Sequence, residues 1–337
     1  MKAYKLPQAA GIGSLTLLEV PTPQPGRGQA LVRMRACSLN YRDLMVAGGR
    51  YARGSVPAGL VPLSDGAGEV AAVGAGVSRV RVGDRVAGIF MQSWLGGQIG
   101  PEDHRSALGG AIDGVLAEYV VFDQEGLVHL PDAYAFEEGA TLPCAALTAW
   151  HALFHQGALL PGHSVLVLGT GGVSIFALQF AHAAGARVIA TSSSPEKLDH
   201  ALALGATDGI DYHATPDWQD AVLRLTGGRG VDHVIEVGGA GTLARSLQAV
   251  RLGGTVHMIG VLTGQAEIDP MPIMRRSLTV RGVYVGSREM FLAMNRAIAF
   301  HDLHPVIDKV FPFAEAPAAY RHLERQAHVG KVVIRVD

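Results

Sequence analysis

The chain has 337 residues, of which 48% are hydrophobic and 17% charged, and its formal net charge is −2. This length exceeds what one hydrophobic core usually serves, so we expect two domains, and the composition excludes a disordered protein. The near-neutral charge and the lack of a basic run argue against a nucleic-acid partner. Only Cys37 and Cys144 are present, which excludes a disulfide-stapled scaffold and favours a reducing cytoplasm.

Neither a signal peptide nor a membrane span is expected. Residues 1–18 lack a continuous apolar core. The most apolar stretch, residues 164–190, carries His182, Arg187 and four glycines, which suits a strand–helix–strand unit better than a bilayer. We therefore expect a cytoplasmic protein without a membrane partner.

The first part of the chain predicts a β-rich domain. Short apolar runs alternate with glycine and proline turns, a pattern typical of a barrel or sandwich. The clearest strands are predicted at residues 29–36, 68–73, 84–90 and 117–122.

From about residue 130 to 285, strands alternate with helices, which predicts a doubly wound parallel sheet covered by helices on both faces. Ser194-Pro195 and Thr215-Pro216 each place a hydroxyl cap before a proline in a first helical turn. Strands are predicted at 164–168, 186–191, 209–212, 233–237, 255–260 and 278–283, and helices at 173–184, 195–204, 216–226 and 242–251.

The tail beyond residue 285 is too short for a domain of its own. It carries two amphipathic segments, 288–300 and 314–326, and a last strand, 331–336, which we expect to complete the N-terminal domain. The predicted organisation is therefore a β-rich domain of residues 1–129 and 286–337 and a nucleotide-binding domain of residues 130–285.

A glycine turn follows the predicted strand 164–168 and opens an apolar helix. It reads Gly169, Thr170, Gly171, Gly172 and Val173, with Ser174 where a third glycine is usual. Glycines let a backbone approach a dinucleotide pyrophosphate, and the helix N-terminus supplies free N–H groups and a partial positive charge. The strand–turn–helix context predicts a dinucleotide site, to which we also assign Gly260 and Val261 at the end of a later strand.

Seven features occur in a fixed order along the chain: Asn40–Leu44, Asp65–Val70, Gly83–Val86, Gly114–Tyr119, Leu147–Trp150, the glycine turn and Gly253–Thr255. As a set they resemble the medium-chain dehydrogenase/reductase superfamily, and within it the zinc-free quinone oxidoreductases and their alcohol-dehydrogenase-like relatives. This resemblance implies a GroES-like β-domain carrying a Rossmann domain, an active site in the cleft between them, and a small-molecule substrate.

The resemblance also places the three catalytic-zinc ligand positions on Asn40, Ser64 and Cys144. Neutral amide and hydroxyl groups are poor zinc ligands, and two cysteines cannot form the four-cysteine structural zinc lobe of the zinc-dependent members. We therefore expect no metal and interpret Cys144 as a small buried hydrophobe. The glycine-rich segment 91–113 occupies the place of that lobe and is expected to be a mobile loop over the cleft.

Without a metal, hydrogen-bond donors must polarise a substrate carbonyl. By resemblance, Asn40 lies near the nicotinamide ribose and Thr148 behind the nicotinamide ring. Tyr41 is the first choice of proton donor and Tyr51 a further catalytic candidate, while Asp43 is expected merely to pair with Arg42.

The cofactor is predicted to be NADPH. NAD sites usually place an acid about 20 residues beyond the glycine turn, whereas residues 190–194 contain none. In the quinone reductases that this sequence resembles, a serine, a lysine and a tyrosine bind the 2′-phosphate, and Ser192, Lys197 and Tyr212 match their spacing. Ser193 is a further hydroxyl at the site, and Ser194 is assigned to the helix cap.

The predicted activity is hydride transfer from NADPH to a quinone, an enone, or an aldehyde or ketone. Two alternatives stay open: a zinc-free enoyl-thioester reductase, and a binding protein that keeps the nucleotide site without catalysis. Relatives pair through edge strands, so the β-rich stretch 276–285 predicts a homodimer, which a mass measurement by light scattering would test.

Overall fold

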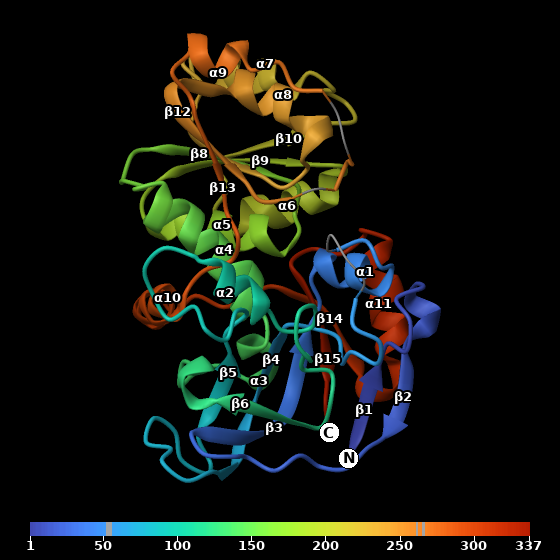
Figure 1. Ribbon diagram of the computed structural model, residues 1–337. Helices are drawn as coiled ribbons and strands as arrows, with labels where there is room; N and C mark the ends of the chain where they lie inside the picture. The colour runs from blue at the N-terminus through green and yellow to red at the C-terminus, as the bar shows by residue number, and fades with distance from the viewer. Residues whose placement is uncertain (52–55, 261, 265–266) are drawn as a thin grey trace. The chain divides into compact units, whose positions relative to one another are not determined.

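The computed structural model describes residues 1–51, 56–260, 262–264 and 267–337, which form two compact units (Figure 1). One unit comprises Met1–Leu147 and Val285–Asp337, and the other comprises Thr148–Tyr284. The sequence suggested a first boundary near residue 130. The structure groups residues 130–147 with the β-rich unit because helix α3 (Phe136–Gly139) packs against strands of that unit.

The described part of the β-rich unit is organised around a sheet in which β15, the last strand of the chain, pairs with the early strand β3. The order is β14-β15-β3-β4-β5-β7, with β6 paired to β3, while β1 and β2 form a separate antiparallel pair. The strands are β1 (Lys2–Lys5), β2 (Thr16–Glu19), β3 (Gln29–Ser38), β4 (Asp65–Val73), β5 (Arg85–Gly88), β6 (Tyr119–Asp123), β7 (Leu127–His129), β14 (Ile307–Pro312) and β15 (Lys331–Arg335).

Helices and turns of this unit pack around the sheet and bury apolar residues such as Met34, Val70 and Tyr320. Beside α3 they comprise α1 (Tyr41–Ala47), α2 (Pro101–Arg105), α10 (Arg288–His301), α11 (Ala316–Glu324), the 3-10 turns η1 (Ile12–Ser14), η2 (Gln124–Gly126) and η5 (Phe313–Glu315), and the π-helix η3 (Leu142–Ala146). Each N-terminal strand predicted from the sequence overlaps an observed one, from β3 to β6.

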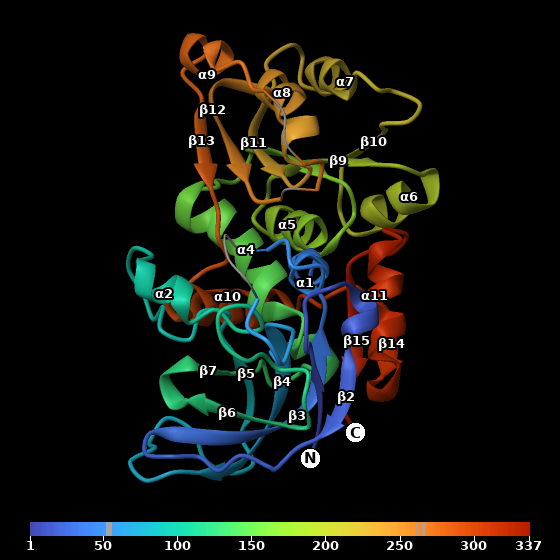
Figure 2. The ribbon, with the colours of Figure 1, turned by 45° about the vertical axis from the view of Figure 1, so that its right-hand side comes forward.

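The second unit contains a parallel six-stranded sheet in the order β10-β9-β8-β11-β12-β13. Helices α5 and α6 lie on one face and α7, α8 and α9 on the other (Figure 2), which confirms the predicted doubly wound architecture. The strands are β8 (Ser164–Leu168), β9 (Arg187–Ser192), β10 (Asp208–Asp211), β11 (Val231–Glu236), β12 (Val250–Met258) and β13 (Thr279–Gly282).

The helices of this unit follow the predicted order. They are α4 (Leu147–Trp150), the π-helix η4 (His151–Gln156), α5 (Gly172–Ala183), α6 (Pro195–Ala203), α7 (Trp218–Leu225), α8 (Ala240–Ala249) and α9 (Met271–Arg275). Strand β13 lies at an edge of the sheet, where the sequence predicted a subunit contact. The homodimer itself stays a prediction.

One local prediction is wrong. Pro216 does not open a helix, because Thr215 belongs to a turn in which its N–H donates to the Asp211 carbonyl (2.8 Å), and α7 begins at Trp218. Segment 91–113 contains α2 and buries Met91, Trp94 and Leu108 in the β-rich unit, so apolar side chains anchor it despite its glycines. That the segment is mobile stays a prediction.

Three histidines, of which His233 and His257 are buried and His163 is half-buried, form a chain on the parallel sheet. His163 Nδ1 lies 3.2 Å from His233 Nε2, and His233 Nδ1 lies 3.3 Å from His257 Nε2. Burial lowers the pKa of His233 to about 4 and that of His257 to about 3, and neighbouring imidazoles and arginines add to both shifts. The Asp232 carboxylate opposes the shift at His233 only in part. Both rings are therefore neutral in the folded protein at neutral pH.

The neutral rings of His233 and His257 predict that the protein loses stability in mild acid. Below the ordinary histidine pKa of 6.5 the unfolded chain takes up protons that folded His233 and His257 cannot, so the unfolding free energy falls as pH drops toward 4. Each ring contributes a fall of about 2 kcal/mol between pH 7 and pH 5. Denaturant unfolding across this range measures the slope. We expect His257→Leu to flatten it, and exposed His200→Asn to leave it unchanged; equal slopes in all three proteins would contradict the assignment.

Candidate functional site

The glycine turn of the second unit has the geometry of a phosphate-binding loop. Strand β8 ends at Leu168, and Gly169 follows with a φ of +71°, which favours glycine. The Gly169 N–H donates to Thr191 Oγ1 on β9 (3.3 Å). Ser174, where a third glycine is usual, donates its Oγ proton to the Leu168 carbonyl (2.7 Å) and so ties α5 to the end of the strand.

The space above this turn is open. A Cβ atom placed on Gly169 or Gly171 would meet no protein atom within 4 Å. Gly171 precedes α5, whose first N–H groups have no partner within the helix. Thr170 is buried, while Gly172 and Val173 are half-buried. Backbone donors, a helix N-terminus and free volume therefore fit a dinucleotide pyrophosphate.

The residues predicted to bind the 2′-phosphate lie near the carboxyl-terminal ends of strands β9 and β10 of the same sheet. Ser192 ends β9, and the Tyr212 N–H, just beyond β10, donates to its carbonyl (3.0 Å). Ser194 accepts a hydrogen bond from the Lys197 N–H (3.4 Å), which confirms the predicted cap of α6. Ser193 and Lys197 are half-buried beside them.

One carboxylate at this edge was missed. Asp211 pairs in register with Ser192, and a nearby acid would repel a 2′-phosphate. Its Oδ1 accepts hydrogen bonds from the N–H groups of His213 (2.8 Å) and Ala214 (3.4 Å), so part of its charge is stabilised within its own turn. Sequence spacing pointed to β9 alone and gave no reason to examine the end of β10.

Three further residues, Thr148, Gly260 and Val261, were also assigned to the cofactor site. Thr148 is buried at the start of the second unit. Gly260 packs against the Val237 carbonyl, where a Cβ would lie 1.7 Å from the oxygen, so close packing alone requires a glycine there. Val261 lies outside the described residues.

In the β-rich unit, Asn40 belongs to a buried charged network. Lys331, on the last strand β15, is 3% exposed and donates from Nζ to Asn40 Oδ1 (2.5 Å) and to the Leu39 carbonyl (2.6 Å). Burial lowers the pKa of Lys331, and the Asp65 carboxylate opposes that shift. Burial likewise raises the pKa of Asp65, opposed chiefly by the Lys331 charge. Two unlike charges thus stabilise each other beside Asn40.

Asp65 connects the other two positions at which the resemblance places zinc ligands. The Ser64 hydroxyl donates to Asp65 Oδ1 (2.7 Å), and the Cys144 N–H donates to Asp65 Oδ2 (3.1 Å). Asn40, Ser64 and Cys144 are therefore brought together around one charge pair. None of them offers a ready zinc donor: the Asn40 oxygen accepts from an ammonium, and burial raises the pKa of the Cys144 thiol, which opposes the thiolate that zinc prefers.

A search of the described residues finds no group of three or more His, Cys, Asp or Glu side chains that could hold a metal ion. The residues present at the three positions do not fit zinc. Sequence reasoning missed Lys331, although a lysine opening an otherwise apolar final strand was a visible signal.

The catalytic candidates Tyr41 and Tyr51 have different surroundings. Tyr41 opens α1 and is half-buried against the hydrophobic core. The Tyr51 ring lies 4.4 Å from the buried Arg42 guanidinium, which also faces the Phe90 ring at 5.0 Å. Gly110 makes room for this arrangement, because a Cβ there would lie 2.4 Å from Arg42 Nη2.

Asp43 has a structural partner, as expected. Its Oδ1 pairs with Arg42 Nη1 (3.3 Å), and its Oδ2 accepts from the Asn40 N–H (2.7 Å). Burial raises the pKa of Asp43 to about 6, although the Arg42 charge opposes the shift. Asp43 thereby fixes the backbone of Asn40 while Lys331 fixes its side chain.

Among the described residues, no helix is both long enough and apolar enough to cross a bilayer.

Residues 26–132 match the family model of the alcohol dehydrogenase GroES-like domain, and residues 172–299 match that of the zinc-binding dehydrogenases.

Known proteins resemble the chain over its full length. A zinc-type alcohol dehydrogenase-like protein of Schizosaccharomyces pombe is 45% identical over 98% of this chain and 97% of its own. A solved NAD-dependent alcohol dehydrogenase is 34% identical with a TM-score of 0.92, covering all of both chains. A mycobacterial protein solved with NADPH is 28% identical with a TM-score of 0.83, again over all of both chains.

The glycine turn, the doubly wound sheet and the GroES-like unit thus occur together with full-length similarity to alcohol dehydrogenases. The chain belongs to the medium-chain dehydrogenase/reductase superfamily, as a nicotinamide-dinucleotide-binding oxidoreductase of the alcohol dehydrogenase type.

Proposed function

We propose that this protein is a zinc-independent, NADPH-dependent oxidoreductase that transfers hydride to a quinone, an enone, or an aldehyde or ketone. The observation that carries the proposal is the set of hydrogen bonds from buried Lys331 to Asn40, and from Ser64 and Cys144 to buried Asp65, which engages the three positions without forming a zinc donor set. A zinc-free enoyl-thioester reductase and a non-catalytic NADPH-binding protein are the alternatives. The cytoplasmic location expected from the sequence stays a prediction.

The choice of NADPH rests on the edge formed by β9 and β10. The residues assigned to the 2′-phosphate, Ser192, Ser193, Lys197 and Tyr212, lie at or just beyond the ends of β9 and β10 and in the first turn of α6, and they carry hydroxyls and one ammonium. An ammonium and hydroxyls suit a phosphate, to which they donate charge-assisted hydrogen bonds. Asp211 and the similarity to an NAD-dependent alcohol dehydrogenase argue for NADH, whereas the relative complexed with NADPH agrees with the proposal.

We assign the catalytic roles to side chains that can donate a proton or a hydrogen bond to the substrate. When bound, the nicotinamide supplies the hydride. We assign to Tyr41 the proton that neutralises the developing charge on the substrate oxygen, because a neutral phenol is a competent acid at that point. Lys331 donates to the Asn40 oxygen and so fixes the orientation of the Asn40 carboxamide. Arg42 holds the ring of Tyr51, the second candidate donor.

The function is tested by turnover in the presence of a metal chelator. We expect the purified protein to contain substoichiometric zinc and to oxidise NADPH with enones, quinones or aldehydes in excess chelator. Tyr41→Phe should lower turnover by about 100-fold while leaving the Kd for NADPH unchanged, because the phenol acts as charge develops.

Each alternative gives a different result in the same assay. A preference for enoyl thioesters would identify the reductase alternative, and NADPH binding without any turnover would identify the binding protein. About one zinc per chain with activity lost in chelator would refute zinc independence. A comparable loss of turnover in Tyr51→Phe, with none in Tyr41→Phe, would transfer the donor role to Tyr51.

Gly171→Ala should separate folding from cofactor binding. Gly171 has an ordinary φ of −73°, and an added Cβ meets no protein atom within 4 Å, so the unfolding free energy should change by less than about 1 kcal/mol. The same methyl group occupies the space assigned to the pyrophosphate, so NADPH affinity should fall at least about tenfold. Gly169→Ala is the comparison variant, because its φ of +71° adds backbone strain. Unchanged affinity in Gly171→Ala would remove the turn from the cofactor site.

Lys197→Ala should weaken NADPH binding selectively. Loss of one charge-assisted contact to the 2′-phosphate predicts a roughly tenfold rise in the Kd for NADPH and no change for NADH. Fluorescence titration of both cofactors measures this. Lys309→Ala, which removes the same charge from the other unit, is the matched control. Equal affinity of the wild type for both cofactors would overturn the NADPH assignment. Equal losses of affinity for both cofactors in Lys197→Ala would leave Lys197 without a role at the 2′-phosphate.

A further inference from the structure

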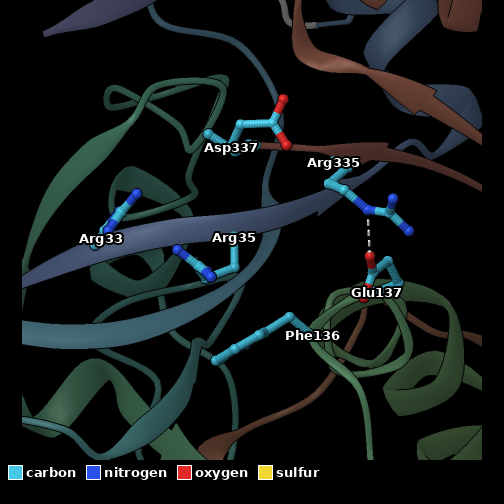
Figure 3. Close-up of a pocket in the computed structure, with 7 residues that line it drawn as sticks. Arg33, Arg35, Phe136, Glu137, Arg335 and Asp337 are labelled. Carbon is cyan, nitrogen blue, oxygen red and sulfur yellow. Dashed lines mark hydrogen bonds and ion pairs between the residues drawn. The ribbon is translucent and has the colours of Figure 1, made fainter.

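Three arginines line a cavity in the β-rich unit that the proposed function does not use. The cavity has a volume of about 410 Å³. Figure 3 shows its side chains, which come from β3, β15 and α3. Its lining is Arg33, Arg35, Phe136, Glu137, Arg335, Val336 and Asp337.

Strand alternation places two of these cations together. Arg33 and Arg35 are two residues apart on β3, so their side chains lie on the same face of the sheet, while Met34 between them is buried. On the neighbouring strand β15, Arg335 pairs with Ala36, the residue after Arg35. The three arginines therefore line one cavity.

The positive charges in this cavity are only partly compensated. Arg335 Nε donates to Glu137 Oε1 at 2.7 Å. Among the described residues, no ion pair joins Arg33 or Arg35 to a carboxylate. The Arg35 guanidinium instead lies 5.9 Å from the centre of the Phe136 ring. Figure 3 shows the Asp337 carboxylate directed away from Arg33 and Arg35. Neighbouring like charges on one sheet are unfavourable unless an anion joins them.

We propose that this arginine pocket binds a small multivalent oxyanion, a phosphate ester or a di- or tricarboxylate. Guanidinium groups bind both classes through paired, charge-assisted N–H donors. Phe136 supplies an apolar wall at the Arg35 side, and Glu137 limits the charge that the pocket accepts. The site lies wholly within the β-rich unit, whereas the glycine turn belongs to the other unit. The proposal is therefore independent of the cofactor assignment.

Calorimetric titration of the full chain with pyrophosphate and with citrate tests the pocket. Because the glycine turn can also take phosphate groups, arginine variants rather than the wild type alone identify the site. We expect Arg35→Ala and Arg335→Ala each to weaken anion binding by about fivefold or more, and Glu137→Gln to strengthen it. Binding of pyrophosphate alone would assign the site to phosphate esters, and binding of citrate alone to carboxylates.

Arg81→Ala is the matched control, since it removes the same charge from an exposed side chain outside the pocket. It should titrate like the wild type, and circular dichroism should show all variants folded. The proposal is overturned if neither anion binds at about 10 mM in low salt, where charge screening is weak. It is equally overturned if Arg35→Ala and Arg335→Ala bind like the wild type, or if Arg81→Ala loses as much affinity as they do.

Discussion

The buried opposite charges of Lys331 and Asp65 lie beside the candidate catalytic residue Asn40 and oppose the cost of each other's burial. Lys331 comes from the last strand, Asp65 from the start of β4, and Asn40 is the residue that precedes α1. The Cys144 N–H reaches the same carboxylate from a π-helix. Removing either charge would leave the other buried and unpaired, which is strongly unfavourable. The orientation of Asn40 therefore depends on a residue nearly 300 positions away in the chain.

In the second unit, which carries the glycine turn, the candidate cofactor site must leave space for a ligand. Gly169 turns the chain where a side chain would be strained, and Gly171 leaves free volume before α5. Ser174 then holds the helix to the strand through the Leu168 carbonyl. The turn is thus rigid on its protein side and open on its outer side, which is the arrangement that backbone recognition of a phosphate requires.

Local signals in the sequence predicted the elements well and the contacts between distant elements poorly. Strand β8 was predicted with its observed bounds because a continuous apolar run ends at a glycine turn. The Ser194 cap was also confirmed, whereas Pro216 misled because Asp211 organises a turn before α7. Lys331 and Asp211 were missed because their importance comes from strand pairing, which single-residue patterns do not encode. Likewise, the buried anchors of segment 91–113 outweighed its glycines.

The two units bury titratable groups in opposite ways, and this difference supports a functional reading of Lys331. In the nucleotide unit, His233 and His257 are buried as neutral rings, so they add no charge to the interior at neutral pH. In the β-rich unit, a lysine and an aspartate are buried together, although well-packed apolar residues often stabilise such a position equally well or better. Packing alone therefore gives no reason to keep that pair. Holding the Asn40 carboxamide in one orientation, through the hydrogen bond from Lys331 to its oxygen, does give one.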